Sequence, residues 1–246
     1  MSNISVNHTL GQIVAERPAL ARAFERLGLD YCCGGQQTLG QACAEHGLGV
    51  EVVLGALDDA GRSADPAERN WPDASLAELC DHIVATHHAY LKTELPRLDG
   101  LFDKVVQVHG GRHAELPECR AIFGALRAEL ETHMQKEELI LFPLIAQMDA
   151  AQAPVCAHCG SVRNPIRVME MEHDSAGTAL VRLRKLTGDY VRPADACNSY
   201  QALLTGLAGL EADLHTHIHK ENNILFPRAI QLEEAGFADR QAGREL

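Results

Sequence analysis

The chain has 246 residues, enough for one large domain or two smaller ones with a substantial core. Aromatic residues make up only 4 %, so Leu, Ile, Val and Ala must build that core, as they do in helical bundles. The formal net charge of −12 argues against nucleic acid and anionic membrane surfaces as partners. Without a long apolar run or a signal peptide, we expect a cytoplasmic protein whose Cys residues are thiols, metal ligands or redox groups.

Residues 1–60 predict a small helical domain. Apolar residues recur at helical spacing between positions 10 and 27, and Pro18 marks a break or a new helix start. The run Cys32-Cys33-Gly34-Gly35 predicts a turn, and Thr38 is a suitable N-cap for the helix that follows it. A third short helix is expected at 50–57.

Residues 61–74 are polar and contain Pro, which predicts a linker to a larger second domain at 75–235. Four long helices are expected there, at about 75–101, 117–145, 165–186 and 195–232. An inserted loop at about 147–165 separates the two helix pairs. Nothing alternates with a period of two over a useful length, so the predicted fold class is all-α.

A polar-then-apolar phrase occurs twice in this second domain. THMQKEELILFPLI occupies residues 132–145 and THIHKENNILFPRA occupies 216–229, with eight of fourteen positions identical. The helices before each phrase also correspond, because His88 aligns with His173 at an offset of 85 residues. The region therefore reads as two helical hairpins of one pattern, which together make a four-helix bundle.

Each phrase places a His and a Glu four residues apart, on one face of a helix. Both pairs fall within stripes of apolar residues at spacings of three and four, so they are expected in the core. His88 and His173 lie in the corresponding stripes of the other two helices, and His87 is out of phase with them. The predicted core ligands are His88, His133, Glu137, His173, His217 and Glu221.

A buried carboxylate without a partner costs several kcal/mol, so two of them among four imidazoles need cations. Two bridging carboxylates would give each of two metals two nitrogens and two oxygens, and an oxide or hydroxide bridge would add a fifth ligand. Imidazole and carboxylate suit iron, manganese or zinc. Zinc usually takes four ligands at a single ion, so the pattern favours two non-haem iron ions.

Two parts of the sequence, the doubled HxxxE helices and the Cys-Cys stretch, resemble a known family. The doubled HxxxE helices, in HMQKEELILFP and HIHKENNILFP, resemble the hemerythrin-like domain. The stretch LGLDYCCGGQQTLGQAC resembles the N-terminal domain of the Repair of Iron Centers proteins, and the match covers nearly the whole chain in order. The resemblance implies a di-iron protein of the stress response to nitric oxide and oxidants, with the same six ligands and with Glu137 and Glu221 as bridges.

The implied function is repair of damaged iron–sulfur clusters by supplying iron, with damaged iron–sulfur proteins as partners. The alternative is a protein that binds, scavenges or senses nitric oxide or dioxygen at the same site. Ions that only hold the bundle together are a third reading. The sequence does not decide whether the site reduces nitric oxide as an enzyme, or whether the chain forms a homodimer.

Several further residues carry expectations of their own. Cys32 and Cys33 match the family's Cys pair, and iron or nitrosyl transfer, thiol exchange, and a purely structural turn are all open. The CxxC pair of Cys156 and Cys159 is left equally open as a redox pair, a shared zinc site or an idle loop. Glu138 should be solvated, since it points about 100° away from Glu137. The family can carry a His near its metals at His109; the other His are expected at the surface or behind the ligands.

Overall fold

The computed structural model describes residues 4–62, 71–152 and 160–242. Within these ranges every element is helical, and bridge pairing occurs only at single residues, such as that between Thr9 and Thr38, so the all-α prediction is confirmed. The α-helices are α1 (Leu10–Glu16), α2 (Ala21–Leu27), α3 (Leu39–Glu45), α4 (Val50–Arg62), α5 (Leu76–Ile83), α6 (Ala89–His109), α7 (Leu116–Lys136), α8 (Phe142–Ala151), α9 (Arg163–Leu186), α10 (Asn198–Lys220) and α11 (Phe226–Ala242). None of these helices is both long enough and apolar enough to cross a membrane.

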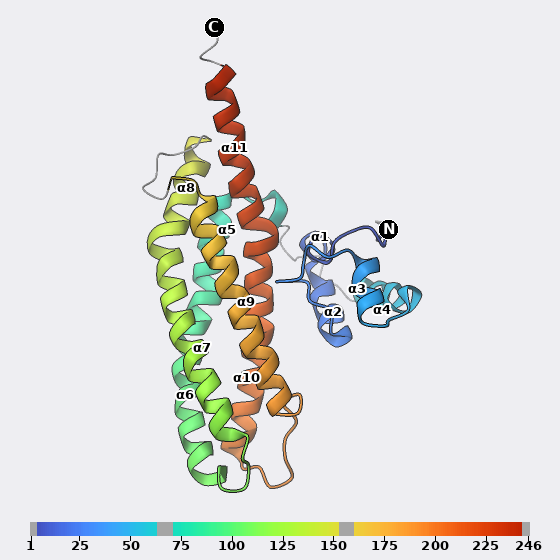
Figure 1. The fold of residues 1–246 in the computed structure, drawn as a ribbon, viewed down its shortest axis with the longest axis vertical. Coiled ribbons are helices and arrows are strands. Elements are labelled where there is room, and N and C mark those ends of the chain that lie inside the picture. Colours follow the sequence, from blue (N-terminus) through green and yellow to red (C-terminus); the bar gives the residue numbers. More distant parts are fainter. Residues whose placement is uncertain (1–3, 63–70, 153–159, 243–246) are drawn as a thin grey trace. The chain divides into compact units, whose positions relative to one another are not determined.

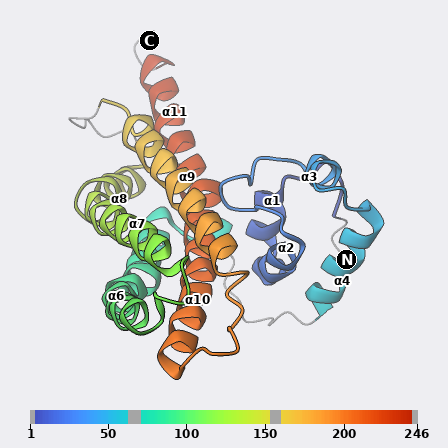
Figure 2. The ribbon, with the colours of Figure 1, turned by 60° about the horizontal axis from the view of Figure 1, so that its bottom comes forward.

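The helices belong to two compact units. The bundle unit consists of the described residues of 80–145 and 157–214, and the N-terminal unit of those of 1–79, 146–156 and 215–246. The bundle unit contains the long helices α6, α7 and α9 and most of α10, which run side by side (Figure 1). The N-terminal unit contains the small helices α1–α4, grouped together in Figure 2.

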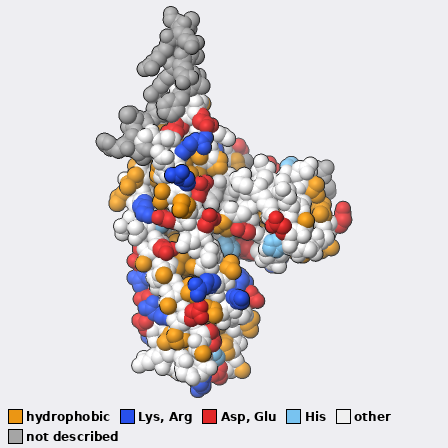
Figure 3. All heavy atoms as spheres, in the orientation of Figure 1, with side chains coloured by type: hydrophobic (Ala, Val, Ile, Leu, Met, Phe, Trp, Pro, Cys, Tyr) orange, Lys and Arg blue, Asp and Glu red, His pale blue; other side chains and the backbone are white. Residues whose placement is uncertain are grey.

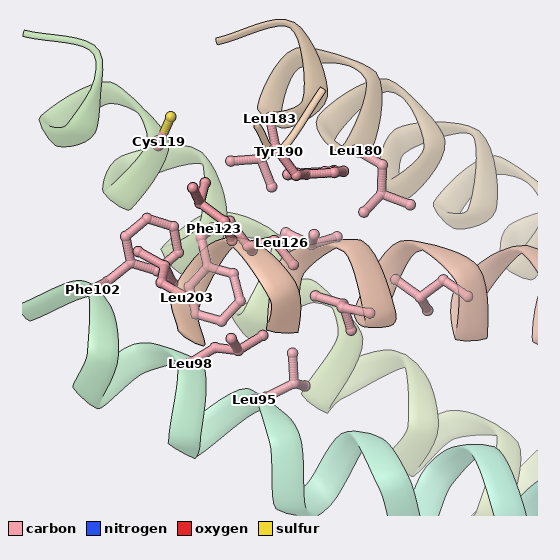
Figure 4. Packing of buried hydrophobic residues seen from close by; sticks show 14 of the residues in the cluster. Leu95, Leu98, Phe102, Cys119, Phe123, Leu126, Leu180, Leu183, Tyr190 and Leu203 are labelled. Carbon is pink, nitrogen blue, oxygen red and sulfur yellow. The ribbon is translucent and has the colours of Figure 1, made fainter. Parts of the chain in front are cut away.

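A continuous apolar core fills the bundle unit. It is supplied by one stripe from each helix, as the spacing of apolar residues predicts, and Figure 4 shows side chains from facing helices interdigitating. Phe102 and Phe123 pack with ring centroids 5.0 Å apart, and Leu98, Leu126 and Leu203 surround them. Each such buried side chain stabilises the fold by roughly 1.5–3 kcal/mol relative to an exposed one. This packing makes the unit a rigid frame for side chains projecting into it.

The surface of the bundle unit carries charges of both signs. Acidic and basic side chains are interspersed on the face drawn in Figure 3. Asp99, for example, pairs with both Arg120 and Arg127, at 2.9 and 2.8 Å. The net negative charge of the chain therefore coexists with local pairing on the bundle surface.

Among the described residues, three wide turns with π-helical geometry interrupt the helices. They are η3 (Val84–His88), η4 (Glu137–Leu141) and η5 (Glu221–Leu225). In the two repeated phrases the first N–H after the turn reaches back five residues, from Phe142 to the carbonyl of Glu137 and from Phe226 to that of Glu221. Pro143 and Pro227 each follow directly. A proline has no N–H to donate, and its ring clashes with the carbonyl four residues before it. A wide turn relieves this clash, so the helix continues through the ILFP run.

The N-terminal unit begins with two matched helix starts. Thr9 and Thr38 each cap a helix through a capping box completed by a Gln three residues later. Pro18 opens a 3₁₀ turn (Pro18–Leu20) before α2. Of the two expected alternatives, a break or a new helix start, it is therefore the new start. The apolar core of this unit includes Phe24 and Tyr31 from the small helices and the turn, and Ile218 from α10.

Part of the expected linker is folded. Residues 63–70 lie outside the described ranges, but α4 runs to Arg62 and Trp71–Asp73 form a 3₁₀ turn. Trp71 is buried, and Arg228 of α11 donates hydrogen bonds to the carbonyls of Trp71 and Ala74 at 3.3 and 2.7 Å. The polar composition of 61–74 gave no indication of this turn and its hydrogen bonds to Arg228.

Candidate metal centre

Four of the predicted ligands lie together in the core of the bundle unit. His88, Glu137, His133 and His173 are all buried, with Glu137 and His88 at 0 % exposure. Nε2 of His88 lies 3.2 Å from Oε2 of Glu137, and Nε2 of His133 lies 3.3 Å from Oε1 of the same carboxylate. Nε2 of His173 lies 3.2 Å from Nε2 of His133. The Glu137 carboxylate therefore sits between imidazoles from two other positions.

Two outer carboxylates determine which nitrogen of each imidazole carries a proton. Nδ1 of His88 lies 2.8 Å from Oε1 of Glu138, and Nδ1 of His133 lies 2.9 Å from Oε2 of Glu172. An ionised carboxylate only accepts hydrogen bonds, so both Nδ1 atoms must donate. In the neutral imidazoles Nε2 then carries a lone pair directed towards Glu137. Ligating histidines commonly show this outward hydrogen bond to a carboxylate.

A lysine completes each of these outer pairs. Glu138 also pairs with Lys92, and Glu172 with Lys136. Burial alone would raise the pKa of either carboxyl, but the hydrogen bonds from the Lys and the His outweigh it and lower the pKa of both. Both are therefore ionised at neutral pH and hold the imidazole protons on the outward side.

The charge balance around Glu137 fits a cation. Both of its oxygens are buried without a hydrogen-bond donor among the described residues. Its nearest nitrogens are the Nε2 atoms whose protons are accounted for on the opposite ring position. A fully buried carboxylate facing lone pairs is unfavourable by several kcal/mol unless a positive charge lies among them. Imidazole nitrogen and carboxylate oxygen are a donor set that iron, manganese and zinc accept.

The second HxxxE phrase has the same internal geometry within the N-terminal unit. His217 lies in the last turn of α10 and Glu221 opens the wide turn η5. Nε2 of His217 is 3.0 Å from Oε1 of Glu221, and both side chains are buried, at 1 % and 0 % exposure. Glu137 and Glu221 thus occupy the same place in their repeats, at the first residue of a π-helical turn. Such turns are frequent at functional sites.

Cys32 and Cys33 lie in a turn organised by Asp30. The Asp30 carboxylate accepts hydrogen bonds from the N–H groups of Cys32, Cys33 and Gly34 at 2.9–3.0 Å. The two sulfurs are 3.9 Å apart, with no disulfide between them. The hydrogen bond with Cys33 and burial raise the pKa of the Cys32 thiol, so it is protonated at neutral pH. A metal or an electrophile would have to displace that proton.

This turn is attached to the helix that carries the second HxxxE phrase. Asn223 donates hydrogen bonds to the carbonyls of Cys32 and Tyr31 at 3.0 and 3.3 Å, and Nδ1 of His219 lies 3.4 Å from the Tyr31 carbonyl. His219 is buried, and burial lowers its pKa to about 4, so it is neutral. His219 and Asn223 stand two positions after His217 and Glu221, so one helical segment carries both the ligand pair and the residues that bind the Cys-Cys turn.

Two expectations about neighbouring residues were wrong. Glu138 is not simply solvated, because it reaches across to the helix of His88 and pairs with that imidazole. His109 ends α6, 21 residues after His88 and thus about 30 Å along the helix; there its Nε2 lies 3.2 Å from Sγ of Cys197.

His87 is buried like His88, but its Nδ1 lies 2.8 Å from Asp213. The CxxC pair at 156–159 lies outside the described residues.

Comparison with known proteins agrees with this geometry. The family model of the hemerythrin HHE cation binding domain matches residues 81–229, and a model described as a domain of unknown function, ScdA_N, matches residues 6–61. Iron-sulfur cluster repair protein YtfE of Escherichia coli O157:H7 is 39 % identical over 221 residues, which are 90 % of this chain and 96 % of that protein. Proteins of the same name from Shigella boydii serotype 4 and Escherichia coli strain K12 / DH10B are each 38 % identical over the same shares.

The buried His and Glu clusters are what a hemerythrin cation-binding domain requires, and the relatives match from the Cys-Cys turn to the second HxxxE phrase. The chain therefore belongs to the hemerythrin-like family of iron–sulfur cluster repair proteins.

Proposed function

We propose that this chain holds two non-haem iron ions and repairs iron–sulfur clusters damaged by nitric oxide or oxidants, by supplying iron. The observation that carries the proposal is Glu137, a fully buried carboxylate facing the proton-free nitrogens of His88 and His133. The naming of the relatives as iron–sulfur cluster repair proteins supports the choice of reaction.

The six predicted ligands would be shared between the two ions. Glu137 and Glu221 would supply the carboxylates shared by the two ions. His88, His133, His173 and His217 would supply the imidazole nitrogens. Four imidazoles and two shared carboxylates would leave each ion room for further oxygen ligands, which suits iron better than four-coordinate zinc.

The protein groups around the ions determine how tightly they are held. Bound ferrous iron would be available for transfer to another protein and could bind nitric oxide or dioxygen. Glu138 and Glu172 keep the imidazole protons on Nδ1, which orients His88 and His133 and makes Nε2 a better donor. We further propose that Cys32 and Cys33, in a turn attached to the second ligand helix, accept or pass on iron during transfer to a cytoplasmic client protein.

The test uses the full chain loaded with iron. It is mixed anaerobically with an iron–sulfur enzyme inactivated by nitric oxide, and the recovery of that enzyme's activity is compared with the recovery given by an equal amount of free ferrous iron. Recovery should exceed that of free iron, and Glu137→Gln should abolish the excess. The matched control is Glu170→Gln, the same substitution at an exposed position of α9, which should keep it.

The same experiment separates repair from simple ligand binding. If the reduced protein forms a nitrosyl spectrum but gives no recovery beyond free iron, the site is a nitric oxide trap or sensor and the repair proposal fails. If neither signal depends on Glu137, the ligand assignment fails as well.

A further inference from the structure

The bundle unit contains a second cluster of metal-binding side chains, at the end of α6 remote from His88. His109 is the last residue of α6, His113 lies in the following turn, and Asp195 and Cys197 come just before α10. We propose that these four residues bind one divalent transition-metal ion of the zinc class. This site shares no residue with the proposed di-iron centre and does not depend on the repair function.

The distances between the donor atoms suit a single ion. Nε2 of His109 is 3.2 Å from Sγ of Cys197, and Nε2 of His113 is 3.0 Å from Oδ1 of Asp195. Donor atoms of His109, His113 and Asp195 all lie within 4.8 Å of one another. In a tetrahedral zinc site, bonds of about 2.0 to 2.3 Å hold neighbouring donors about 3.3 to 3.7 Å apart. Cys197 contacts His109 but does not belong to that group of three, so its side chain must rotate to bring Sγ to the ion.

The backbone already places the two imidazoles together. The N–H of His113 donates to the carbonyl of His109 at 3.0 Å, so the helical turn continues past Gly110 and keeps the two residues on one side. Tyr200 of α10 packs against both rings, with centroids 5.3 Å from each. Since Tyr200 is 2 % exposed, it limits the positions that both rings can take. A preorganised pair of this kind lowers the entropy lost when an ion binds.

The donor set favours zinc over the ions of the di-iron centre. Two imidazoles, one carboxylate and one thiolate combine borderline and soft donors, and zinc accepts all three types in fourfold coordination. Binding releases the thiol proton of Cys197 to solvent, along with the imidazole proton of His113 when it is charged. The thiolate and the carboxylate then balance the two charges of the ion, so the occupied site is neutral.

Two contacts compete with the ion. His113 also lies 3.1 Å from Glu115; although burial tends to lower its pKa, its hydrogen bonds to Asp195 and Glu115 raise the pKa. Arg112 donates to Nδ1 of His109 at 3.4 Å and lies 3.4 Å from Asp195. The Arg112 side chain is 64 % exposed, so it can turn into solvent when a cation arrives. Removing it should strengthen binding, whereas a cluster that is only an ion-pair network would lose a partner.

The experiment follows the reactivity of one thiol. Full-length protein with its di-iron site filled is prepared with Cys156→Ser and Cys159→Ser, so that this pair cannot take up zinc. Iodoacetamide labelling of Cys197, which is exposed, is then measured by peptide mass spectrometry with and without one equivalent of zinc. We expect zinc to slow labelling of Cys197 by at least about tenfold, because a metal-bound thiolate is masked from the reagent.

Variants decide whether the protection comes from this cluster. Asp195→Asn, at an exposed position, and His109→Gln should each remove most of the protection, and Arg112→Ala should lower the zinc concentration required. His46→Gln, at an exposed histidine of the N-terminal unit, is the matched control and should keep it. Equal labelling rates with and without zinc would overturn the proposal. So would protection that survives Asp195→Asn and His109→Gln, since the ion would then lie elsewhere.

Discussion

The substitution Gly11→Ala tests how closely α1 approaches the helix that carries the second HxxxE phrase. A Cβ on Gly11 would lie 2.6 Å from Cγ of Asn223, closer still to its Oδ1, and 3.0 Å from the carbonyl of Gly35. Real Cβ atoms do not approach other heavy atoms this closely, so α1 or Asn223 must move. Gly11 also donates its N–H to the Gly35 carbonyl at 2.8 Å, which resists that movement.

Two opposing effects set the magnitude. Ala is favoured over Gly inside a helix by about 1 kcal/mol, while overpacking of a tight contact costs about 1–3 kcal/mol. The difference leaves a net destabilisation of about 0–2 kcal/mol. The matched control is Gly55→Ala in α4, where an added Cβ meets nothing within 4 Å. That change should stabilise the protein by about 0.5–1 kcal/mol.

A double-mutant cycle isolates the contact. Asn223→Ala alone loses the hydrogen bonds to the carbonyls of Tyr31 and Cys32, at a cost of about 1–3 kcal/mol. In the double variant the added methyl group at Gly11 no longer meets the Asn223 side chain, so the two effects should fall short of additivity by about 1 kcal/mol or more.

The chain's single tryptophan reports the unfolding. Trp71 is buried in the N-terminal unit, where Lys220 lies 5.8 Å from its ring centroid, so its fluorescence during urea unfolding follows the unit that contains both Gly11 and Asn223. Stabilisation by Gly11→Ala equal to that by Gly55→Ala, or strict additivity in the cycle, would refute the close approach.

Four further predictions concern the metal centre, its outer carboxylate and the Cys turn. Glu137→Leu should abolish binding of paired iron while Glu170→Leu leaves it intact, as measured by metal analysis and the visible spectrum; equal loss in both would show that the buried carboxylate is not a ligand. Glu138→Gln should weaken metal affinity about 10–100-fold by releasing the orientation of His88, and a chelator competition that shows no change would contradict this role. Because the pKa of Glu138 is lowered on folding, its stabilisation is present above the ordinary carboxyl pKa and is lost as pH falls through the folded value; the urea midpoint should therefore drop below about pH 4.5, and less so in Glu138→Gln. The thiol of Cys32 has a raised pKa, so its alkylation at neutral pH should be slower than that of an ordinary exposed thiol and should accelerate above pH 9; fast alkylation at pH 7 would rule out the protonated, buried state.

The apolar spacing was sufficient to predict the long helices and the burial of the six predicted ligands. A stripe at intervals of three and four can be read from the sequence, and His133, Glu137, His217 and Glu221 lie in phase with it. Periodicity also favoured His88 over His87 as the partner of Glu137, although the wide turn η3 buries both. Local spacing describes one helix face well because it depends on neighbours along a single helix.

The outer carboxylates could not be found in this way. Glu138 and Glu172 act across helices, so their roles depend on packing distances that no single-helix pattern contains. One signal was present: each is directly adjacent in sequence to a predicted ligand, and a Lys follows each partner histidine by three or four residues. The end of the first long helix was placed too early. The stripe of α6 continues through Phe102 and Val105 to His109, beyond the expected end near residue 101.

The wide turns also limit which sequence changes the protein can accept during evolution. After Glu137 the chain takes five residues to complete a hydrogen-bonded turn, and the apolar residues from Leu141 to Met148 are buried from that starting point. Deleting a single residue from η4 would convert the wide turn into an ordinary helical turn, in which the ring of Pro143 meets the carbonyl four residues before it. Side-chain replacements within the turn are compatible with the fold, as the second copy shows by carrying Asn222 and Asn223 where the first has Glu138 and Leu139. Changes in length are not, so the two phrases should drift in composition while keeping the same count of residues between histidine and proline.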